Sequence, residues 1–177
     1  MRTSRLLLSG VVGLTGAYAL YLRSDARRNG NRLYYRAGRP NRAGRAVGRG
    51  YALFCGLGLG PSWAVALETV GWRSGRVSSI PLVIGELEGK RYLVSMLGEQ
   101  SPWVHNVRAA GGRAVIRHGR RRTVHLTEVP PGERAPIIKA YLSRAAGARP
   151  HIRVDASAPL EAFDRIAGAY PVFRIDE

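Results

Sequence analysis

The chain has 177 residues and a formal net charge of +16, from 28 basic and 12 acidic side chains. This length suits one domain with an appendage and is too short for two ordinary domains. The single cysteine, Cys55, excludes an intramolecular disulfide and argues against a cysteine-based metal site, so a reducing compartment is expected. No zinc-finger pattern, heptad-bearing basic helix or aromatic-glycine RNA motif accompanies the charge, so we predict no nucleic-acid partner.

An uncharged and mostly apolar run covers residues 6–22, with arginines on both sides of it. This run is short for a membrane span, and three interpretations remain open: a short membrane anchor, a secretory signal peptide cleaved after Ala19, or a packed helix. The anchor is favoured because arginines directly after the run would stay on the cytoplasmic side. It predicts a protein on the cytoplasmic side of a membrane, held by a single anchor or peripherally; without an anchor, we expect a cytoplasmic protein.

Residues 29–50 are rich in glycine and arginine and are interpreted as a basic connector with room for one short helix. Its arginines either form a solvated face or attract an anionic membrane surface. Those at helical spacing are Arg39, Arg42, Arg45 and Arg49. Residues 51–59 are a second apolar patch, which is too short to cross a membrane and is expected to pack on the folded domain. The predicted division is therefore an N-terminal segment, 1–50, and a folded domain, 51–177.

Two strands and the turn between them form the central motif of the sequence. Residues 63–70 alternate between the two faces of a half-buried strand, and residues 79–84 form a second β-rich run. The connection at residues 71–76 holds two glycines, one serine and two arginines. Such a turn exposes backbone N–H groups, and Arg73 and Arg76 add guanidinium forks for phosphate or carboxylate oxygens. The motif therefore favours a ligand with an anionic tail.

The remaining elements complete a mixed pattern of strands and helices. Ser101 and Pro102 suit the start of a helix, and Gly111 with Gly112 suits its end. Further strands are expected at residues 91–97, 114–117, 122–129 and 170–175, and helices at residues 102–108, 133–146 and 159–167. About six strands and three helices, without βαβ alternation, predict an α+β fold: a small antiparallel β-barrel with helices packed outside it.

Several familiar catalytic patterns are missing from the sequence. The four histidines have no pair at metal-binding spacing, so no metal site is predicted. Ser74 does not lie in a Gly-x-Ser-x-Gly elbow, which argues against serine hydrolysis. Trp103 is interpreted equally well as a core residue or as a cover for a flat ring. His105 is interpreted as a helix residue near a pocket.

The motifs occur in an order that resembles a known family. They are Gly71-x-Arg73-Ser74-Gly75 in the turn, Ile80-Pro81-Leu82 in the next strand and Trp103-x-His105-Asn106 in the helix. From about Leu67 to Pro130 the chain resembles the deazaflavin-dependent nitroreductase-like family, whose members are FMN-binding-like split β-barrels that bind coenzyme F420. The resemblance implies an F420H2-dependent oxidoreductase that transfers a hydride between F420 and a small hydrophobic, nitro, quinone or conjugated acceptor.

The resemblance also implies which residues contact the cofactor. The turn would hold the phosphate and oligoglutamate tail, the end of the third strand would line the ring, and the next helix would cover it. The implied cofactor-binding residues are Arg73, Ser74, Gly75, Arg76, Ser79, Pro81, Ser95, Met96, Leu97, Gly98, Trp103, Val104, His105 and Asn106. No catalytic side chain is assigned. The chain departs from the family pattern at Trp72, Ser78 and Leu97, where basic residues are usual.

Two alternatives remain open on the same fold. A split barrel could use FMN, FAD or heme in place of F420, although F420 is preferred on the motif order. The altered turn could also belong to a membrane-associated protein that binds a cofactor or lipid without catalysis. Turnover of F420H2 with a small-molecule acceptor would separate an enzyme from such a binder.

Overall fold

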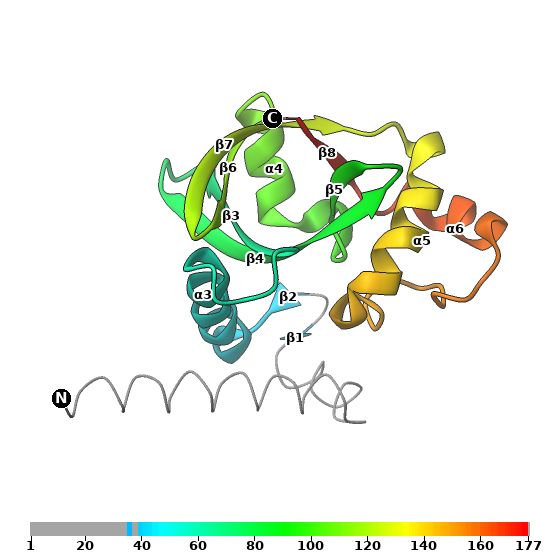
Figure 1. Cartoon of the computed structure of the whole chain (residues 1–177), viewed down its shortest axis with the longest axis horizontal. Coiled ribbons are helices and arrows are strands. Elements are labelled where there is room, and N and C mark those ends of the chain that lie inside the picture. The colour runs from blue at the N-terminus through cyan, green and yellow to red at the C-terminus, as the bar shows by residue number, and fades with distance from the viewer. Residues whose placement is uncertain (1–34, 37–38, 177) are drawn as a thin grey trace.

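The computed structural model of the protein describes residues 35–36 and 39–176 (Figure 1). Its centre is a closed barrel of six strands in the order β3-β4-β5-β8-β7-β6. Every neighbouring pair in the barrel is antiparallel. The strands are β3 Ala64–Val70, β4 Val77–Leu87, β5 Lys90–Val94, β6 Arg113–His118, β7 Arg120–Glu128 and β8 Val172–Asp176. This architecture confirms the predicted α+β split barrel.

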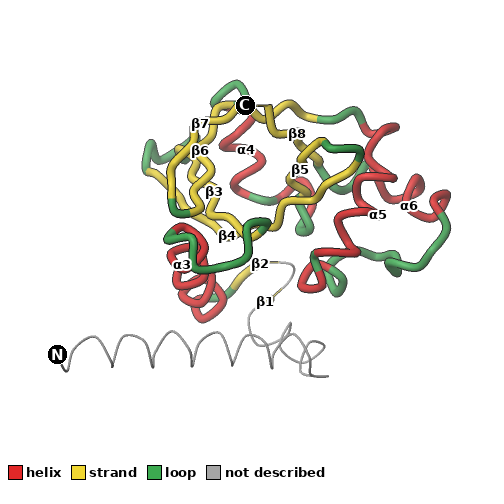
Figure 2. Tube along the Cα trace, viewed as in Figure 1, coloured by secondary structure: helices red, strands yellow, loops and turns green. Residues whose placement is uncertain are grey.

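Helices pack on the outside of the barrel, and α4 lies within its outline (Figure 2). The α-helices are α3 Arg42–Gly56, α4 Pro102–Ala109, α5 Arg134–Arg144 and α6 Leu160–Ala167. Short 3-10 turns lie at Gly98–Gln100, Pro131–Glu133 and Ala146–Ala148, and two-residue strands pair at β1 Tyr35–Arg36 and β2 Arg39–Pro40. The predicted helices at residues 102–108, 133–146 and 159–167 are therefore present, with small shifts at their ends.

One hydrophobic core fills the barrel itself. Leu67, Leu93 and Phe173 come from three strands and are almost completely buried. Helix α4 contributes Trp103 to the same core, where its ring centroid lies 5.3 Å from that of Phe173. Because α4 delivers its apolar side chains into the barrel, the helix and the strands share one packed interior.

A second hydrophobic core lies outside β4, β5 and β8, beneath α5 and α6. Ile138, Leu142 and Phe163 of the helices are fully buried there. Gly85 of β4 faces Tyr141 of α5, and a Cβ at this position would lie 3.3 Å from the tyrosine Cβ. The glycine therefore lets α5 approach the strand closely, and the helix pair forms the flank seen at the right of Figure 1.

Helix α3 is longer and begins earlier than the sequence predicted. The basic connector and the apolar patch at residues 51–59 were expected as separate segments, yet one helix of 15 residues spans much of both. Asn41 begins it by accepting a hydrogen bond at Oδ1 from the Gly44 backbone N–H at 2.8 Å. The helix packs on β3 and β4, as expected of the patch, and Gly119 N donates to Gly56 O at 3.0 Å. It runs through residue 50, and the domain boundary there remains a prediction.

Several strands differ from their predicted bounds: β7 begins two residues early and β8 two residues late, and β4 and β5 differ for clear local reasons. β4 starts at Val77, two residues early, because Val77 pairs with Val70 directly after the turn. β5 ends at Val94 and not at residue 97, since Ser95 Oγ lies 2.8 Å from Gly98 O and closes a turn. Within residues 35–36 and 39–176 no helix is long and apolar enough to cross a membrane. The predicted anchor at residues 6–22 lies outside the described residues.

Candidate functional site

The turn between β3 and β4 has a tightly specified backbone. Gly71 N donates to Arg76 O at 2.8 Å, and Gly71 O accepts from the backbone N–H of Gly75 at 2.8 Å. Gly75 has a φ of +65°, which favours glycine. A Cβ at position 71 would lie 2.5 Å from Ser74 Oγ, an oxygen that accepts the Arg76 N–H at 3.3 Å. Gly71 therefore leaves room for the Ser74 hydroxyl beneath the turn, and Gly75 allows the backbone conformation that the turn requires.

Asn106 joins this turn to helix α4. Its Oδ1 accepts a hydrogen bond from Trp72 N at 3.1 Å, and its Nδ2 donates to Thr69 Oγ1 at 3.0 Å. Asn106 and Thr69 are both buried. Because buried amides and hydroxyls are costly to leave without partners, the side chain of Asn106 fixes where the turn begins relative to α4.

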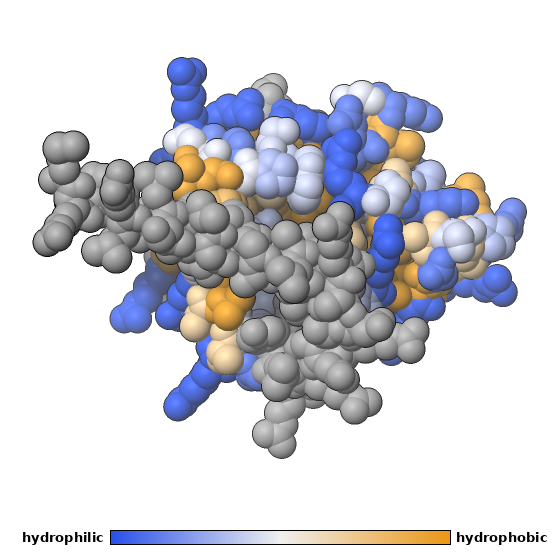
Figure 3. Space-filling model, turned by 60° about the horizontal axis from the view of Figure 1, so that its bottom comes forward, coloured by the Kyte–Doolittle hydropathy of each residue, from blue (hydrophilic) through white to orange (hydrophobic). Residues whose placement is uncertain are grey.

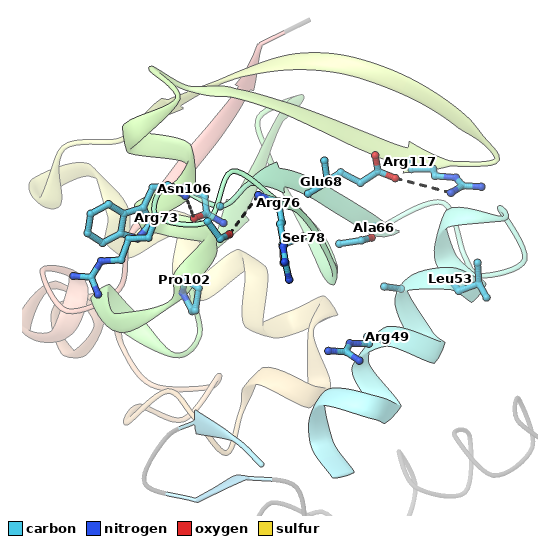
Figure 4. A pocket seen from close by; sticks show the side chains of 16 residues that line it. Arg49, Leu53, Ala66, Glu68, Arg73, Arg76, Ser78, Pro102, Asn106 and Arg117 are labelled. Carbon is cyan, nitrogen blue, oxygen red and sulfur yellow. Dashed lines mark hydrogen bonds and ion pairs between the residues drawn. The ribbon is translucent and has the colours of Figure 1, made fainter. Parts of the chain in front are cut away.

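A cleft of about 650 Å³ opens between α3, the turn and the start of α4 (Figure 4). This volume lies in the range of sites for small molecules and cofactors. The side chains that line it come from α3, β3, the turn, β4, α4 and β6. They are Arg49, Ala52, Leu53, Ala66, Glu68, Gly71, Trp72, Arg73, Ser74, Arg76, Val77, Ser78, Ser79, Pro102, Asn106 and Arg117.

The electrostatic character of the cleft is strongly positive. Four arginines and one acid, Glu68, line it. The Glu68 side chain is 10% exposed and is neutralised by Arg121, at 2.6 Å, and by Arg117, at 3.9 Å. Figure 4 shows Arg49 and Arg76 pointing into the space between α3 and the turn. Glu68 is already paired with Arg117 and Arg121. The guanidinium groups of Arg49 and Arg76 can therefore bind an anionic group in the cleft.

Arg73 has a different environment from Arg76. Its guanidinium carbon lies 4.3 Å from the centroid of the Trp72 ring, in a cation–π contact. The Trp72 ring also lies near His105, with the two ring centroids 6.2 Å apart. Figure 4 shows Arg73 directed away from Arg49. Trp72 thus holds Arg73 at the mouth of the cleft.

The structure brings some of the predicted cofactor residues together and places others elsewhere. Arg73, Ser74, Arg76, Ser79 and Asn106 line the cleft, and Gly75 forms the tip of the turn beside it. Among the predicted residues, those that do not line the cleft are Gly75, Pro81, Ser95, Met96, Leu97, Gly98, Trp103, Val104 and His105.

Burial explains the placement of several of these. Ser95 is buried, and its Oγ lies 2.7 Å from Ser101 Oγ, so the pair stabilises the entry to α4. Trp103 and Val104 are buried in the barrel core. Of the two interpretations of Trp103, its burial against Phe173 favours the core residue. His105 is exposed on α4 beside Trp72.

Three charged residues of the cleft were not predicted from the sequence. Arg49 was assigned to a connector, although its helical spacing to Arg42 and Arg45 was a usable signal. Glu68 lies in the predicted strand at residues 63–70, and Arg117 lies in the predicted strand at residues 114–117. Their approach depends on barrel closure, because Glu68 in β3 pairs with Val115 in β6. β3 and β6 are far apart in the sequence, and no local pattern in either strand predicts that they pair.

Comparison with known protein families identifies a family that the chain matches. A model of the family described as F420H(2)-dependent quinone reductase matches residues 52–156, more than half of the chain. The matched region includes β3, the turn, β4, β5, α4, β6, β7 and α5. A comparison with curated proteins finds no match.

The chain is also similar to several solved structures, each at low sequence identity. One, described as an F420-H2 dependent reductase (FDR-A), is 20% identical, with 65% of this chain and 95% of that chain covered at a TM-score of 0.44. Another is described as a putative 5-nitroimidazole antibiotic resistance protein from Bacteroides thetaiotaomicron, 10% identical, with coverage of 64% and 72% and a TM-score of 0.45. A conserved hypothetical protein from Mycobacterium tuberculosis is 17% identical, with coverage of 79% and 82% and a TM-score of 0.45.

Proposed function

Because the chain belongs to the F420H(2)-dependent quinone reductase family and is an F420-dependent oxidoreductase, we propose that the cleft beside the β3–β4 turn holds coenzyme F420. The observation that carries this proposal is the meeting of Arg76, Ser74 and Ser79 in a cleft of about 650 Å³ with an excess of positive charge. The coenzyme has a phosphate and a glutamyl tail, both anionic. The charge and size of the cleft therefore fit this cofactor.

In this proposal the residues of the cleft bind and orient the cofactor. Arg76 points into the cleft and binds an anionic oxygen of the tail, while Arg73 binds a second one at the mouth. Ser79 adds a hydroxyl on β4. Asn106 keeps the turn in register with α4 through its bonds to Trp72 and Thr69. When bound, the reduced coenzyme supplies a hydride to the acceptor, so the protein itself needs chiefly to position two ligands and exclude water.

We propose a quinone as the preferred acceptor, ahead of nitro or other conjugated compounds. The description of the family supports this choice. The rim of the cleft supports it too, since Leu53, Trp72 and Val77 line the cleft and are all more than half exposed. Apolar side chains beside arginines suit an uncharged, flat acceptor that lies next to a charged cofactor.

A titration with F420 tests the cofactor, and F420H2 oxidation tests the reaction. Full-length protein should quench or shift the deazaflavin fluorescence at micromolar concentration, and quinones should be reduced faster than nitroaromatics of similar size. FMN, FAD and heme serve as competing ligands in the same titration. Tight binding of one of these without F420 binding would assign another cofactor. F420 binding without turnover on any acceptor would indicate the non-catalytic binder.

We also propose that the N-terminal segment attaches the protein to an anionic membrane surface on its cytoplasmic side. The apolar run at residues 6–22 and the eleven arginines of the first 50 residues support this location. Full-length protein should pellet with membranes and resist salt extraction. Deletion of residues 1–28 should make any remaining attachment extractable with salt and leave a folded barrel that binds F420.

Two other results of the deletion would end the anchor interpretation. An insoluble barrel after deletion would mean that residues 6–22 form a packed helix of the fold. A secreted form of the full-length protein that starts at Leu20 would mean that they form a signal peptide.

A further inference from the structure

Helix α3 carries its large apolar side chains on the outside. The residues that it buries against the barrel are small: Ala52, Cys55 and Gly56. Val47 and Leu53, in contrast, point outward and are 55% and 58% exposed. Leu57 and Leu59, directly after the helix, are 51% and 54% exposed. A helix that serves only the fold would bury its aliphatic residues, so the outer side of α3 is apolar surface that the described fold does not use.

Most of the exposed large hydrophobic residues of the described chain lie on α3, directly after it, or at the β3–β4 turn. Apart from those four, the large hydrophobic residues with high exposure are Val70, Trp72 and Val77 at the β3–β4 turn, and Leu160 on α6. The α3 group and the turn group adjoin each other, because Leu53, Trp72 and Val77 line the same cleft. Figure 3 brings this side forward and shows apolar surface between hydrophilic side chains.

The charges on this helix all have the same sign. Arg42, Arg45 and Arg49 are exposed, and α3 contains no acidic residue. On a helical projection the three arginines lie along one edge of the outward face, and Leu53 and Val47 lie further around it. An apolar stripe flanked by arginines is the pattern of a helix that lies in the plane of a membrane interface. We call Val47, Leu53, Leu57, Leu59 and these arginines the α3 face.

We propose that the α3 face docks on an anionic lipid bilayer, with the helix in the plane of the headgroups and the mouth of the cleft opening at the lipid surface. This contact belongs to the folded domain and does not depend on residues 1–34. Leu53, Leu57 and Val47 would enter the interface, and Arg42 and Arg45 would meet anionic headgroups, while Arg49 points into the cleft.

A second copy of the chain suits the α3 face less well than lipid does. In a twofold dimer, the same patch of each copy faces the other. Two α3 faces would then bring arginines together without an acid from either helix. Anionic lipid supplies the opposite charge together with the apolar region that the aliphatic side chains require. Charge complementarity therefore selects the bilayer.

The experiment places a fluorescent probe on the α3 face of the full-length protein. Leu57→Cys is labelled with an environment-sensitive dye, and Leu160→Cys on α6 is the matched control, since Leu160 is also exposed. Cys55 is completely buried and should not react with the dye. With vesicles of phosphatidylcholine and phosphatidylglycerol that carry a lipid-bound quencher, the probe at position 57 should shift to shorter wavelength and be quenched. The probe at position 160 should stay unchanged.

Charge variants test the same contact by affinity. In the double variant Arg42→Gln with Arg45→Gln, the lipid concentration needed for half-maximal quenching at position 57 should rise by about fivefold for each arginine removed. Arg165→Gln on α6 should leave that lipid concentration unchanged. Equal signals at positions 57 and 160 would overturn the proposal, because attachment would then come from residues 1–28 alone. A probe at position 57 that is shielded without vesicles would also overturn the proposal. If the shielding rises with protein concentration, a second copy of the chain covers the α3 face; if it does not, another part of the same chain covers it.

Discussion

Replacement of both Arg73 and Arg76 by alanine should weaken F420 binding by a hundredfold or more. A hydrogen bond to a charged group contributes about 1.5–3 kcal/mol, so two lost guanidinium contacts correspond to about two to four orders of magnitude in Kd. Both side chains are exposed in the free protein. The free energy of unfolding should therefore change by no more than about 0.5 kcal/mol. Fluorescence titration and urea unfolding measure the two quantities.

The single variants should not be equivalent. Arg76 already points into the cleft, whereas Arg73 must leave its contact with Trp72 before it can reach a ligand. We therefore expect Arg76→Ala to cost more affinity than Arg73→Ala. Arg144→Ala on α5, where the arginine pairs with Glu86 at 3.4 Å, is the control and should leave F420 binding unchanged. If stability falls and binding does not, the two turn arginines are structural.

Glu128→Ala should lower the free energy of unfolding by about 3 kcal/mol, because it leaves a buried guanidinium without its carboxylate. Arg134 is buried at the start of α5 and donates from Nη2 to Glu128 Oε1 at 2.9 Å and from Nε to Val129 O at 2.8 Å. Glu128 also accepts from Arg108 Nη2 at 2.6 Å. This network joins the end of β7 to the start of α5 and to Arg108 of α4.

Glu99→Ala is a matched control for this prediction. Glu99 pairs with the same Arg108, at 2.6 Å, but its side chain is 46% exposed. An exposed ion pair contributes about 0–1 kcal/mol, so the loss should be small. The hydrogen bond from Arg108 lowers the pKa of Glu99 below 4.5, and the contribution of this pair is therefore present above that pH and lost only in more acidic solution. Equal losses for the two variants would mean that Arg134 does not depend on Glu128.

The strands of the barrel were predictable because their signals are local. The alternation in residues 63–70 and the glycine-containing turns around it predicted β3, the turn and β4 close to their observed positions. Helix α3 was partly missed because Gly44, Gly48 and Gly50 are poor helix formers. Tertiary packing compensates for them, since the small residues of the helix fit closely against the barrel.

The cleft was predictable where its residues come from the turn or from the motifs next to it, such as Ser79 in β4 and Asn106 in α4. Arg76 and Ser74 were expected there, but Arg49, Glu68 and Arg117 reach the cleft from a helix and two strands that meet through barrel closure. The direction of Arg73 depends on the ring of its neighbour Trp72, which no periodicity encodes. Side-chain direction and contacts between distant elements are thus the parts that the sequence pattern leaves open.

The position of β8 in the barrel has a consequence for synthesis on the ribosome. β8 lies between β5 and β7 and closes the barrel, although two strands and three helices separate it from β5 along the chain. Until β8 emerges from the exit tunnel, a nascent chain exposes the unpaired edges of both partners. Barrel closure therefore cannot precede the emergence of β8, and the open intermediate is the species that chaperones would need to protect from aggregation.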